Sequence, residues 1–270
     1  MLELHAADKT FEAGTPNEVH CLRDIDLTIE TGQFVTVIGS NGSGKSSLLN
    51  AVAGKVLLDS GRITIDGRTV TRWSEHRRAK LVGRVFQDPF AGTAPGMSIA
   101  ENLALAARRG MRRGLGWALT GDVMEGIGER VAMLNMGLED RLDSPIGVLS
   151  GGQRQALTLL MATWLKPKVL LLDEHTAALD PKTADQVVRL SEELISRDNL
   201  TTMMVTHSMQ QAANLGSRLI MMHKGRIIRD FEGAEKQRIR VNDLLETFEE
   251  VRRIEQLDVS AAAMLAQSYV

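Results

Sequence analysis

The chain has 270 residues, of which 43% are hydrophobic and 24% are charged, and this composition excludes a disordered or low-complexity protein. The 32 Lys and Arg residues against 34 Asp and Glu residues give a net charge of −2, which excludes a global attraction to nucleic acid or acidic lipid. The single cysteine, Cys21, excludes an internal disulfide.

The N-terminal residues and the apolar runs bear on location. The segment MLELHAADKT lacks the basic start and the apolar stretch of a secretory signal. No apolar run approaches the roughly 20 residues that a membrane-spanning helix needs. We therefore expect a cytoplasmic chain, and any membrane span should belong to another subunit.

The first elements predicted along the chain are strands. Short apolar-polar alternation over the first forty residues predicts antiparallel strands. Residues 34–38 (FVTVI) form an apolar run typical of a central strand that is covered on both faces. A Gly-rich turn over residues 39–44 follows, and from Ser46 the apolar spacing predicts a helix that stops at Gly54. Strand, glycine loop and helix thus follow in order.

The next segments alternate between strand and helix patterns. Asp66-Gly67 within residues 62–70 predicts a hairpin. Residues 88–165 are rich in Ala, Leu, Met and Arg, which predicts a helical insertion. The core pattern then returns as a strand at 169–172, a helix at 182–197, a strand at 201–205, a hairpin through Lys224-Gly225 and a helical tail from 241. These elements predict an α/β fold with a mostly parallel central sheet, an antiparallel β subdomain and an inserted helical subdomain.

Residues 39–46 (GSNGSGKS) fit the pattern G-x-x-x-x-G-K-[ST] and lie between a predicted buried strand and a helix N-terminus. Glycines let the backbone form a nest of N–H groups for phosphate oxygens, and Lys45 would neutralise the β and γ phosphates. Ser46 would ligate Mg²⁺. The alternative is a flexible turn that binds nothing, which the flanking elements disfavour. The predicted nucleotide-binding residues here are Gly39, Ser40, Asn41, Gly42, Ser43, Gly44, Lys45, Ser46 and Ser47.

Two adjacent acids, Asp173 and Glu174, end the apolar strand VLLL. The carboxyl ends of strands in an open α/β sheet are where ligands gather. Asp173 is the expected partner of Mg²⁺ through water, and Glu174 is the candidate general base for the attacking water. Two acids after a strand are by themselves more often a helix cap. The pair indicates a nucleotide site here because the phosphate loop is also present.

The segment Leu149-Ser-Gly-Gly-Gln153 reads as another exposed helix start. Ser150 and Gln153 form a capping-box pattern, and Gly151 and Gly152 would let an anion approach closely. The alternative interpretation is that this segment only caps the helix and binds no ligand. The string, however, resembles the signature motif of ABC ATPases, and it precedes Asp173 and Glu174 at that family's typical spacing.

The resemblance to ABC ATPases covers about residues 2–231, and the motifs occur in the family's order. It implies a P-loop NTPase fold with one domain over 1–240: a RecA-like core with an antiparallel β subdomain (1–87 and 166–240) and a helical subdomain (88–165). Residues 241–270 would be a helical tail.

The resemblance also assigns roles to single residues. Gln87 would sense Mg²⁺ and the attacking water, Asp180 would be the D-loop aspartate, and His207 would contact the γ phosphate. Phe11 would stack on adenine, although a small core aromatic is a nearly even alternative. Ser150, Gly151, Gly152, Gln153 and Asp180 would contact nucleotide held by a second copy. The chain departs from the family at His175, where many relatives have Pro, and we assign His175 no catalytic role.

The mechanism implied by the resemblance is an ATP-dependent, head-to-tail homodimer in which each nucleotide lies between Lys45 of one copy and Ser150 of the other. The expected partners are integral membrane permease subunits and, indirectly, an extracytoplasmic solute-binding protein, with no nucleic acid. The chain would lie on the cytoplasmic face of the membrane. Residues 108–117 (RRGMRRGLGW) could approach the permease or lipid headgroups, but a solvated basic helix end is the favoured interpretation.

Several strings, among them VIGSNGSGKSSLLNAVAG and DEHTAALDPKTA, look most similar to ATPases of tryptophan/tyrosine-type uptake systems. An importer motor is therefore the leading hypothesis. A soluble ABC ATPase linked to iron-sulfur assembly or nucleic acid is the alternative. A non-hydrolytic binding module conflicts with the presence of Glu174 and His207.

Overall fold

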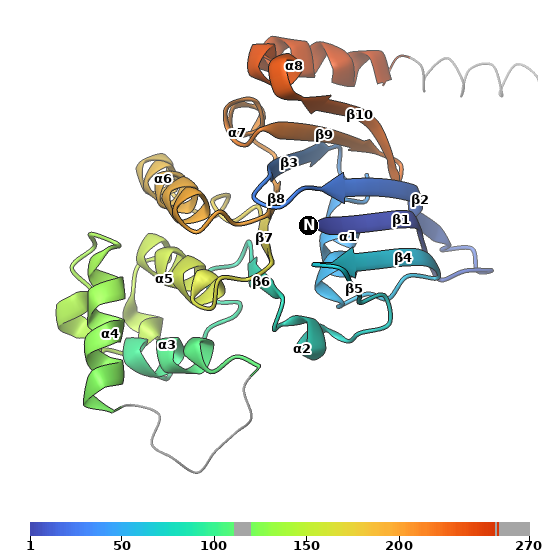
Figure 1. Ribbon diagram of the computed structural model, residues 1–270. Coiled ribbons are helices and arrows are strands. Elements are labelled where there is room, and N and C mark those ends of the chain that lie inside the picture. Colours follow the sequence, from blue (N-terminus) through green and yellow to red (C-terminus); the bar gives the residue numbers. More distant parts are fainter. Residues whose placement is uncertain (111–119, 252, 254–270) are drawn as a thin grey trace, which may run out of the picture.

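The computed structural model describes residues 1–110, 120–251 and 253. Most of the basic stretch at 108–117 lies outside these residues. The fold class predicted from the sequence is confirmed, because the described residues form a mostly parallel sheet, an antiparallel sheet and a group of helices (Figure 1).

The larger sheet of the described residues has the strand order β10-β9-β3-β8-β7-β6. Its strands from β9 to β6 run parallel, and only β10 pairs antiparallel with its neighbour. The predicted strand at 34–38 is β3, which lies inside this sheet and is buried from Val35 to Ile38. The strands span Phe34–Gly39 (β3), Val82–Val85 (β6), Val169–Asp173 (β7), Thr202–Val205 (β8), Arg218–His223 (β9) and Arg226–Glu232 (β10).

The smaller sheet is antiparallel, with the strand order β2-β1-β4-β5 among the described residues. Its strands span Leu2–Phe11 (β1), Val19–Ile29 (β2), Ser60–Ile65 (β4) and Arg68–Thr69 (β5). The predicted hairpin joins β4 to β5, and both turn residues, Asp66 and Gly67, have positive φ (52° and 73°). Positive φ at both central residues is what a tight hairpin turn of this kind requires.

The helices are arranged on both sides of the larger sheet (Figure 1). They span Lys45–Ala53 (α1), Glu75–Arg78 (α2), Ile99–Ala107 (α3), Gly121–Ala132 (α4), Gly151–Thr163 (α5), Pro181–Arg197 (α6), Met209–Asn214 (α7) and Gly233–Arg238 (α8), with short 3-10 turns at Glu139–Arg141 and Ile146–Val148. Residues 241–251 are also helical.

Strand β7 shows how the two faces of the sheet are filled. Val169 and Leu171 belong to the apolar cluster that contains α1 and the antiparallel sheet, whereas Leu170 and Leu172 belong to the cluster that contains α3, α4, α5 and α6. Because successive side chains point to opposite faces, a strand covered on both sides must be apolar throughout. This is why residues 169–172 read as an uninterrupted apolar run.

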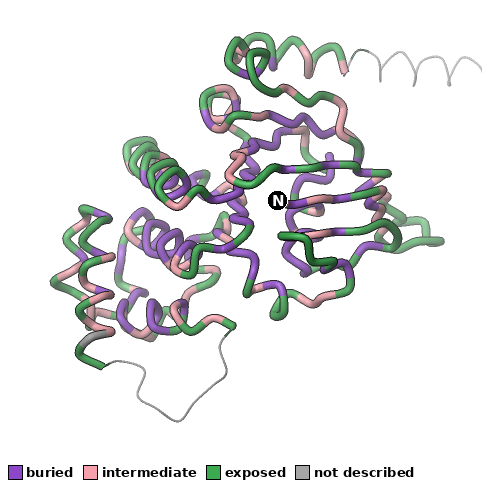
Figure 2. The backbone as a smooth tube through the Cα atoms, viewed as in Figure 1, coloured by how far each residue is buried: buried purple, intermediate pink, exposed green. Residues whose placement is uncertain are grey.

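The helical subdomain shares its core with the sheet. Leu157 and Leu160 of α5 lie in one cluster with Val85 of β6 and with Ile99 of α3. Helix α5 thus packs both on the sheet and on the other helices, and the purple buried positions run continuously across this region (Figure 2). Helix α5, which begins at the signature segment, is therefore packed against the core.

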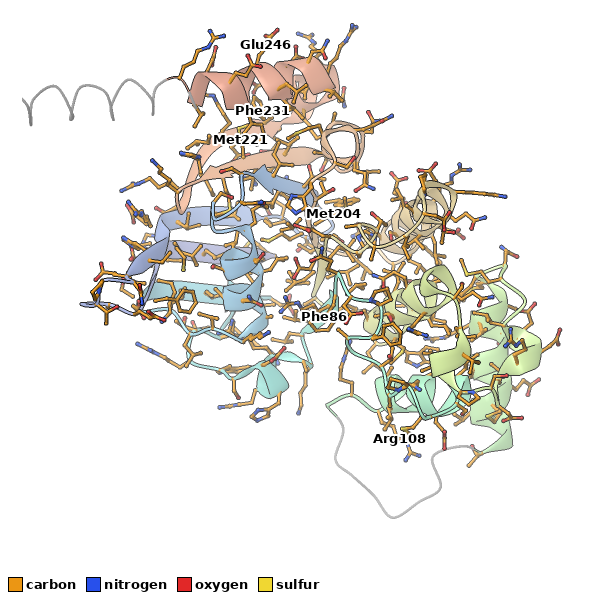
Figure 3. The ribbon with its side chains drawn as sticks, turned by 180° about the vertical axis from the view of Figure 1, so that it is seen from behind. Phe86, Arg108, Met204, Met221, Phe231 and Glu246 are labelled. Atoms are coloured by element: carbon orange, nitrogen blue, oxygen red, sulfur yellow. The ribbon has the colours of Figure 1, made fainter. Side chains whose placement is uncertain are left out.

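A third apolar cluster covers the other end of the sheet. It contains Met221 of β9 and Leu244 of the last helix, with Phe231 of β10 packed against it. Figure 3 shows Met221 and Phe231 below this helix, while Glu246 lies on its exposed side. The boundary of the tail at 241 stays a prediction, but the described part of the tail is docked through Leu244.

Arg78 is a fully buried cation that closes the C-terminal end of α1. Its guanidinium donates to the carbonyl oxygens of Ala51 (2.5 Å) and Val52 (2.9 Å), and also to those of Thr71 and Trp73. The last carbonyls of a helix lack intrahelical partners and carry partial negative charge, so a cation there stabilises the helix. Burial lowers the pKa of Arg78 to about 10.

Candidate functional site

The phosphate loop, residues 39–46, joins β3 to α1 as the sequence predicts. Gly44 has a φ of 103°, and a Cβ there would lie 2.4 Å from the carbonyl oxygen of Cys21. A side chain at this position would therefore meet both backbone strain and a rigid neighbour. Gly42 also has positive φ (78°), but a Cβ there would meet nothing within 4 Å. The loop is thus tightly packed on its inner side and open on the outer side.

Lys45 lies at the first position of α1 and is buried. Its Nζ donates to the carbonyl oxygens of Gly39 (2.8 Å) and Ser40 (3.0 Å). Burial lowers the pKa of Lys45, and the nearby charge of Glu174 acts in the opposite direction. A partly desolvated ammonium held only by two backbone carbonyls is well placed to exchange those partners for the stronger charge of a phosphate.

Glu174 and His207 meet across the ends of neighbouring strands. Glu174 follows β7 and His207 follows β8, and His207 Nε2 lies 2.5 Å from Glu174 Oε1. The carboxylate is 9% exposed, whereas the imidazole is 51% exposed. Glu174 has a φ of 46°, a left-handed conformation that is uncommon for a side chain of this kind and that occurs often at functional sites. The two residues form one polar unit at the carboxyl edge of the sheet.

Asp173 lies in an ion pair that the sequence did not predict. Its Oδ2 accepts from Arg84 Nη2 at 2.8 Å, and Arg84 Nη1 donates to Asn50 Oδ1 of α1 at 2.8 Å. Arg84 also stacks on the ring of Phe86, with 4.7 Å between the guanidinium and the ring centroid. An arginine in the short buried strand β6 is unusual, and this was the available signal for a charged partner inside the sheet.

The predicted site residues converge on a cavity of about 550 Å³. Its lining includes residues from the phosphate loop, both strand-end groups and the β1–β2 edge. Those predicted from the sequence are Phe11, Asn41, Gly42, Gly44, Lys45, Ser46, Ser47, Gln87, Glu174 and His207. The predicted residues Gly39, Ser40, Ser43 and Asp173 are not part of the lining. Sequence reasoning missed four lining residues of the β1–β2 edge: Glu12, Asn17, Val19 and Cys21.

Phe11 stands at the rim of the cavity and is 40% exposed, so it is not a core aromatic. It pairs across the strands with Val19, which is 54% exposed, and Lys9 Nζ lies 5.5 Å from the centre of its ring. An exposed aromatic beside an apolar neighbour is a surface on which a planar base can stack.

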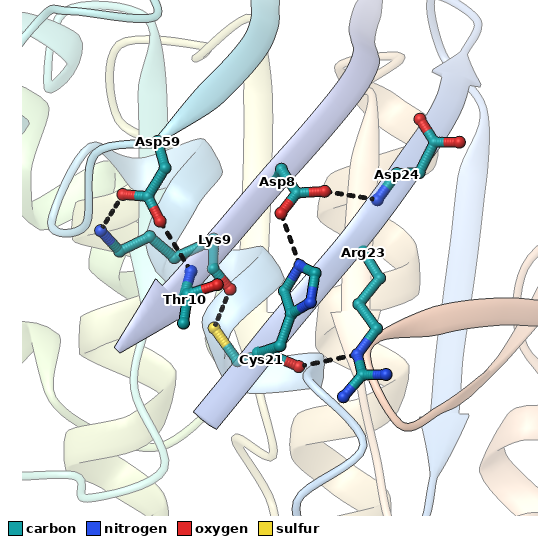
Figure 4. A network of polar contacts seen from close by, with 8 residues as sticks. Asp8, Lys9, Thr10, Cys21, Arg23, Asp24 and Asp59 are labelled. Carbon is teal, nitrogen blue, oxygen red and sulfur yellow. Dashed lines mark hydrogen bonds and ion pairs between the residues drawn. The ribbon is translucent and has the colours of Figure 1, made fainter. Parts of the chain in front are cut away.

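A polar network next to Phe11 fixes this edge of the cavity (Figure 4). Asp59 accepts from Lys9 Nζ (2.6 Å) and from the backbone N–H of Thr10 (2.7 Å), and the hydrogen bond from Lys9 lowers the pKa of Asp59. The Cys21 thiol donates to the Lys9 carbonyl at 3.2 Å. These contacts hold β1 through a stretch where its register with β2 shifts, and they present Phe11 and Cys21 to the cavity.

The signature segment lies outside this cavity. Ser150 caps α5, and the capping box with Gln153 is present in both directions (3.3 and 3.2 Å). A Cβ on Gly152 would lie 2.0 Å from Thr183 Cγ2, near the start of α6, whereas one on Gly151 would meet only Leu179 Cδ2 at 3.3 Å. Gly152 therefore allows α5 and α6 to approach each other, which the sequence alone did not reveal.

Asp180 caps α6 near the same place. Its carboxylate accepts from the Thr183 N–H at 3.1 Å, and the hydrogen bonds from Thr183 lower the pKa of Asp180. Thr183 thus contacts both Asp180, through its N–H, and Gly152 of the signature segment, through its methyl group.

His175, the departure from the family pattern, is a buried residue. Its Nε2 lies 3.0 Å from Ser191 Oγ, and Ser191 donates its own hydrogen to the Val187 carbonyl, so the ring nitrogen is the donor. Burial lowers the pKa of His175 to about 4. The imidazole is therefore neutral at physiological pH and joins the turn after Glu174 to α6.

The site fits a magnesium nucleotide. Ser43 Oγ is buried without a hydrogen-bond partner among the described residues, and the outer side of the loop is open at Gly42. No group of three or more His, Cys, Asp or Glu side chains in the described residues could hold a metal by itself. Magnesium usually takes one or two protein oxygens and completes its shell from phosphates and water. The hydroxyl of Ser46 and the carboxylate of Asp173 offer ligands of that kind.

Comparison with known proteins decides the family. Residues 22–177 match the family described as ABC transporter. The chain is 43% identical to the tyrosine transport ATP-binding protein of Clostridioides difficile, over 92% of this chain and 99% of that protein. The chain belongs to the ABC transporter family. Within that family, the chain is an ATP-binding, ATP-hydrolysing subunit.

The chain is also similar to other ATP-binding proteins and to solved cassettes. The phosphonates import ATP-binding protein of Thiobacillus denitrificans is 35% identical over 82% of this chain and 84% of that protein. A spermidine/putrescine import ATP-binding protein of Haemophilus influenzae is 34% identical over 85% of this chain, which spans 57% of that longer protein. A solved ATP-binding cassette, a dimer in a post-hydrolysis state bound to ADP and Pi, superimposes with a TM-score of 0.73 at 28% identity, covering 86% of this chain and 98% of that one.

None of the helices in residues 1–110 and 120–251 combines the length and the apolar character that crossing a bilayer demands.

Proposed function

We propose that this ABC ATPase drives an importer for an aromatic amino acid of the tryptophan or tyrosine type. The similarity to a tyrosine transport ATP-binding protein, over nearly the full length of both chains, supports the cargo class. The other relatives named above are import ATP-binding proteins as well, which supports import over a soluble role in iron-sulfur assembly or on nucleic acid.

The observation that carries the catalytic proposal is the pairing of Glu174 and His207 beside Lys45 and the phosphate loop. Glu174 would orient the attacking water and accept its proton, since its carboxylate faces the cavity where the γ phosphate would lie. His207 would hold Glu174 and contact the γ phosphate, and Lys45 would neutralise the charge of the phosphates. Phe11 would stack on adenine.

Magnesium would be held by Ser46 and, through water, by Asp173, and Gln87, which also lines the cavity, would sense it. When bound, the ion would neutralise charge on the β and γ phosphates. The pair between Arg84 and Asp173 leaves the second oxygen of the carboxylate for this role.

The active form would be a head-to-tail homodimer. Ser150, Gly151, Gly152, Gln153 and Asp180 lie outside the cavity of their own chain, so they would reach a nucleotide only on a second copy. The similar cassette solved as a dimer with ADP and Pi supports this arrangement. ATP would close the pair, and its hydrolysis would let the pair open.

A permease would dock on the groove beside Gln87. This groove has a volume of about 450 Å³ and lies between the core and the helical subdomain, lined among others by Phe86, Leu105 and Met161. A largely apolar groove of this size fits one short helix from a membrane partner. The chain would then lie on the cytoplasmic face of the membrane, and an extracytoplasmic solute-binding protein would act through the permease.

Uptake in cells tests the proposal. Deletion of the gene should abolish uptake of labelled tyrosine or tryptophan, and the wild-type chain should restore it while the Glu174→Gln variant should not. Affinity purification from solubilised membranes should recover a multi-span permease. Recovery of ribosomes, DNA or an iron-sulfur scaffold, with uptake unchanged in the deletion strain, would contradict the importer assignment.

A further inference from the structure

A glutamine in the first part of α7 bridges the two loops that carry the proposed catalytic pair. Gln211 Nε2 donates to Thr176 Oγ1 at 3.1 Å, and Gln211 Oε1 accepts from Thr206 Oγ1 at 2.8 Å. Thr176 lies two residues after Glu174, and Thr206 directly precedes His207. One amide side chain thus uses both of its ends to join the segment after β7 to the segment after β8.

Both threonines are fixed parts of their loops. Thr176 is 7% exposed and Thr206 is 4% exposed. Thr206 Oγ1 also accepts from the Ser208 N–H (3.0 Å), and the Thr206 N–H donates to the Val37 carbonyl of β3 (3.3 Å). The Thr206 hydroxyl therefore links Gln211 to the backbone on either side of His207, and the Thr176 hydroxyl links it to the segment after Glu174.

Gln211 belongs to α7, and several hydrogen bonds fix the position of this helix. Its N–H donates to Ser208 Oγ, the N-cap of α7, at 3.2 Å. Thr36 of β3 donates to the Ala212 carbonyl at 3.3 Å, and Lys236 of α8 donates to the Ala213 carbonyl at 2.6 Å. The strand that feeds the phosphate loop and the C-terminal segment both hold α7 in place.

We propose that Gln211 is a positioning residue for ATP hydrolysis, acting as a brace that sets the distance between the Glu174 and His207 loops. The inference rests on the proposed roles of those two residues. Their side chains meet at 2.5 Å although Glu174 has a left-handed backbone conformation, which persists only where the surroundings hold it. The Glu174 N–H donates to the Val205 carbonyl (2.9 Å), so the ends of β7 and β8 stay joined without the brace. The brace adds a side-chain link between the residues just beyond those ends, Thr176 and Thr206, and so fixes the orientation of Glu174 and His207 toward each other.

Gln211→Met tests the brace, because methionine keeps the length of the side chain and removes both hydrogen bonds. Small misplacements of reacting groups cost up to about 100-fold in rate, so we expect kcat to fall at least roughly tenfold while KM for ATP changes less than about twofold. Gln211→Glu should restore most of the rate, because a carboxylate can accept from both threonine hydroxyls. Gln210→Met is the matched control, since Gln210 is exposed on the same helix, and it should behave as wild type.

A second set of variants covers the case in which Gln211→Met fails to fold. Thr176→Val removes one arm of the brace, the hydrogen bond from Gln211 Nε2, and should lower kcat with little change in KM. Combining it with Gln211→Met should lower kcat no further than Gln211→Met alone, because both changes remove the same hydrogen bond. Unchanged kcat in both single variants, or equal losses in kcat and in nucleotide affinity, would overturn the brace. Normal turnover by Glu174→Gln would instead overturn the proposed function.

Discussion

The chain has two glycine-containing segments that lead into a helix, the phosphate loop and the signature segment. Their structures differ. The phosphate loop has positive φ at Gly42 and Gly44, an orphaned Ser43 hydroxyl and a buried lysine nearby. The signature segment has an ordinary capped helix start in which Ser150 and Gln153 satisfy each other. The first segment has a buried hydroxyl without a hydrogen-bond partner among the described residues, whereas in the second the capping groups satisfy each other.

This difference indicates where each segment finds its partner. The phosphate loop borders a cavity in its own chain, together with Glu174 and His207 from neighbouring strand ends. The signature segment is not part of the lining of that cavity, and Gly152 packs against Thr183 at the start of α6. Changes to side chains that line the cavity, such as Glu174, should therefore affect nucleotide chemistry with little effect on folding, whereas a side chain added at Gly152 should affect folding as well.

The largest effect is expected for Glu174→Gln. The amide cannot accept the proton of the attacking water, so turnover should fall at least about 100-fold while ATP still binds. The variant should accumulate as a nucleotide-bound dimer, measurable by size-exclusion chromatography with ATP against ADP. Thermal unfolding should differ little from wild type. Turnover within a few-fold of wild type would show that another group is the base.

The pH dependence of stability should report His175. Its pKa falls to about 4 on folding, so between pH 6.5 and about 4 the unfolded chain binds a proton that the folded chain does not. The free energy of unfolding is therefore highest, as far as His175 contributes, above pH 6.5. It decreases by up to about 3 kcal/mol as the pH falls toward 4. His175→Gln, which keeps a donor toward Ser191, should show a flatter dependence in urea unfolding over this window. An identical slope in both proteins would refute the assignment.

A smaller effect is expected for Gly152→Ala. A methyl group there would overlap Thr183, and overpacking of this kind costs about 1–3 kcal/mol. Gly151→Ala is the matched control at the preceding position of the same helix, where a Cβ would meet only the flexible end of Leu179. It should be neutral or slightly stabilising because alanine favours helix over glycine. Equal unfolding midpoints for the two variants would contradict the close packing of Gly152 on Thr183.

The sequence predicted the fold and most of the cavity lining because those features are local. A phosphate loop between a strand and a helix, an acid pair at a strand end and the turn at Asp66-Gly67 are each written within a few consecutive residues. The family resemblance supplied Gln87, Asp180 and His207, and the structure brings Gln87 and His207 to the cavity but not Asp180.

The features that the sequence could not predict join distant residues. Arg84 reaches Asp173 across 89 positions, Arg78 reaches the end of α1 across 27, and Gln211 reaches Thr176 across 35. No periodicity or motif encodes such pairs, because they arise only when neighbouring strands and helices are in place. An arginine within the apolar strand β6 was a local hint that a partner had to exist, but it did not identify Asp173.

Titration calorimetry with Mg-ATP on the wild-type chain and on Lys45→Ala tests the central claim most directly. We expect the folded wild-type chain to bind with a clear heat signal and the variant to lose at least about 100-fold in affinity, because its phosphate site lacks the buried ammonium. Equal binding by both proteins, or no heat from folded wild-type material, would contradict the assignment of this cavity as the nucleotide site.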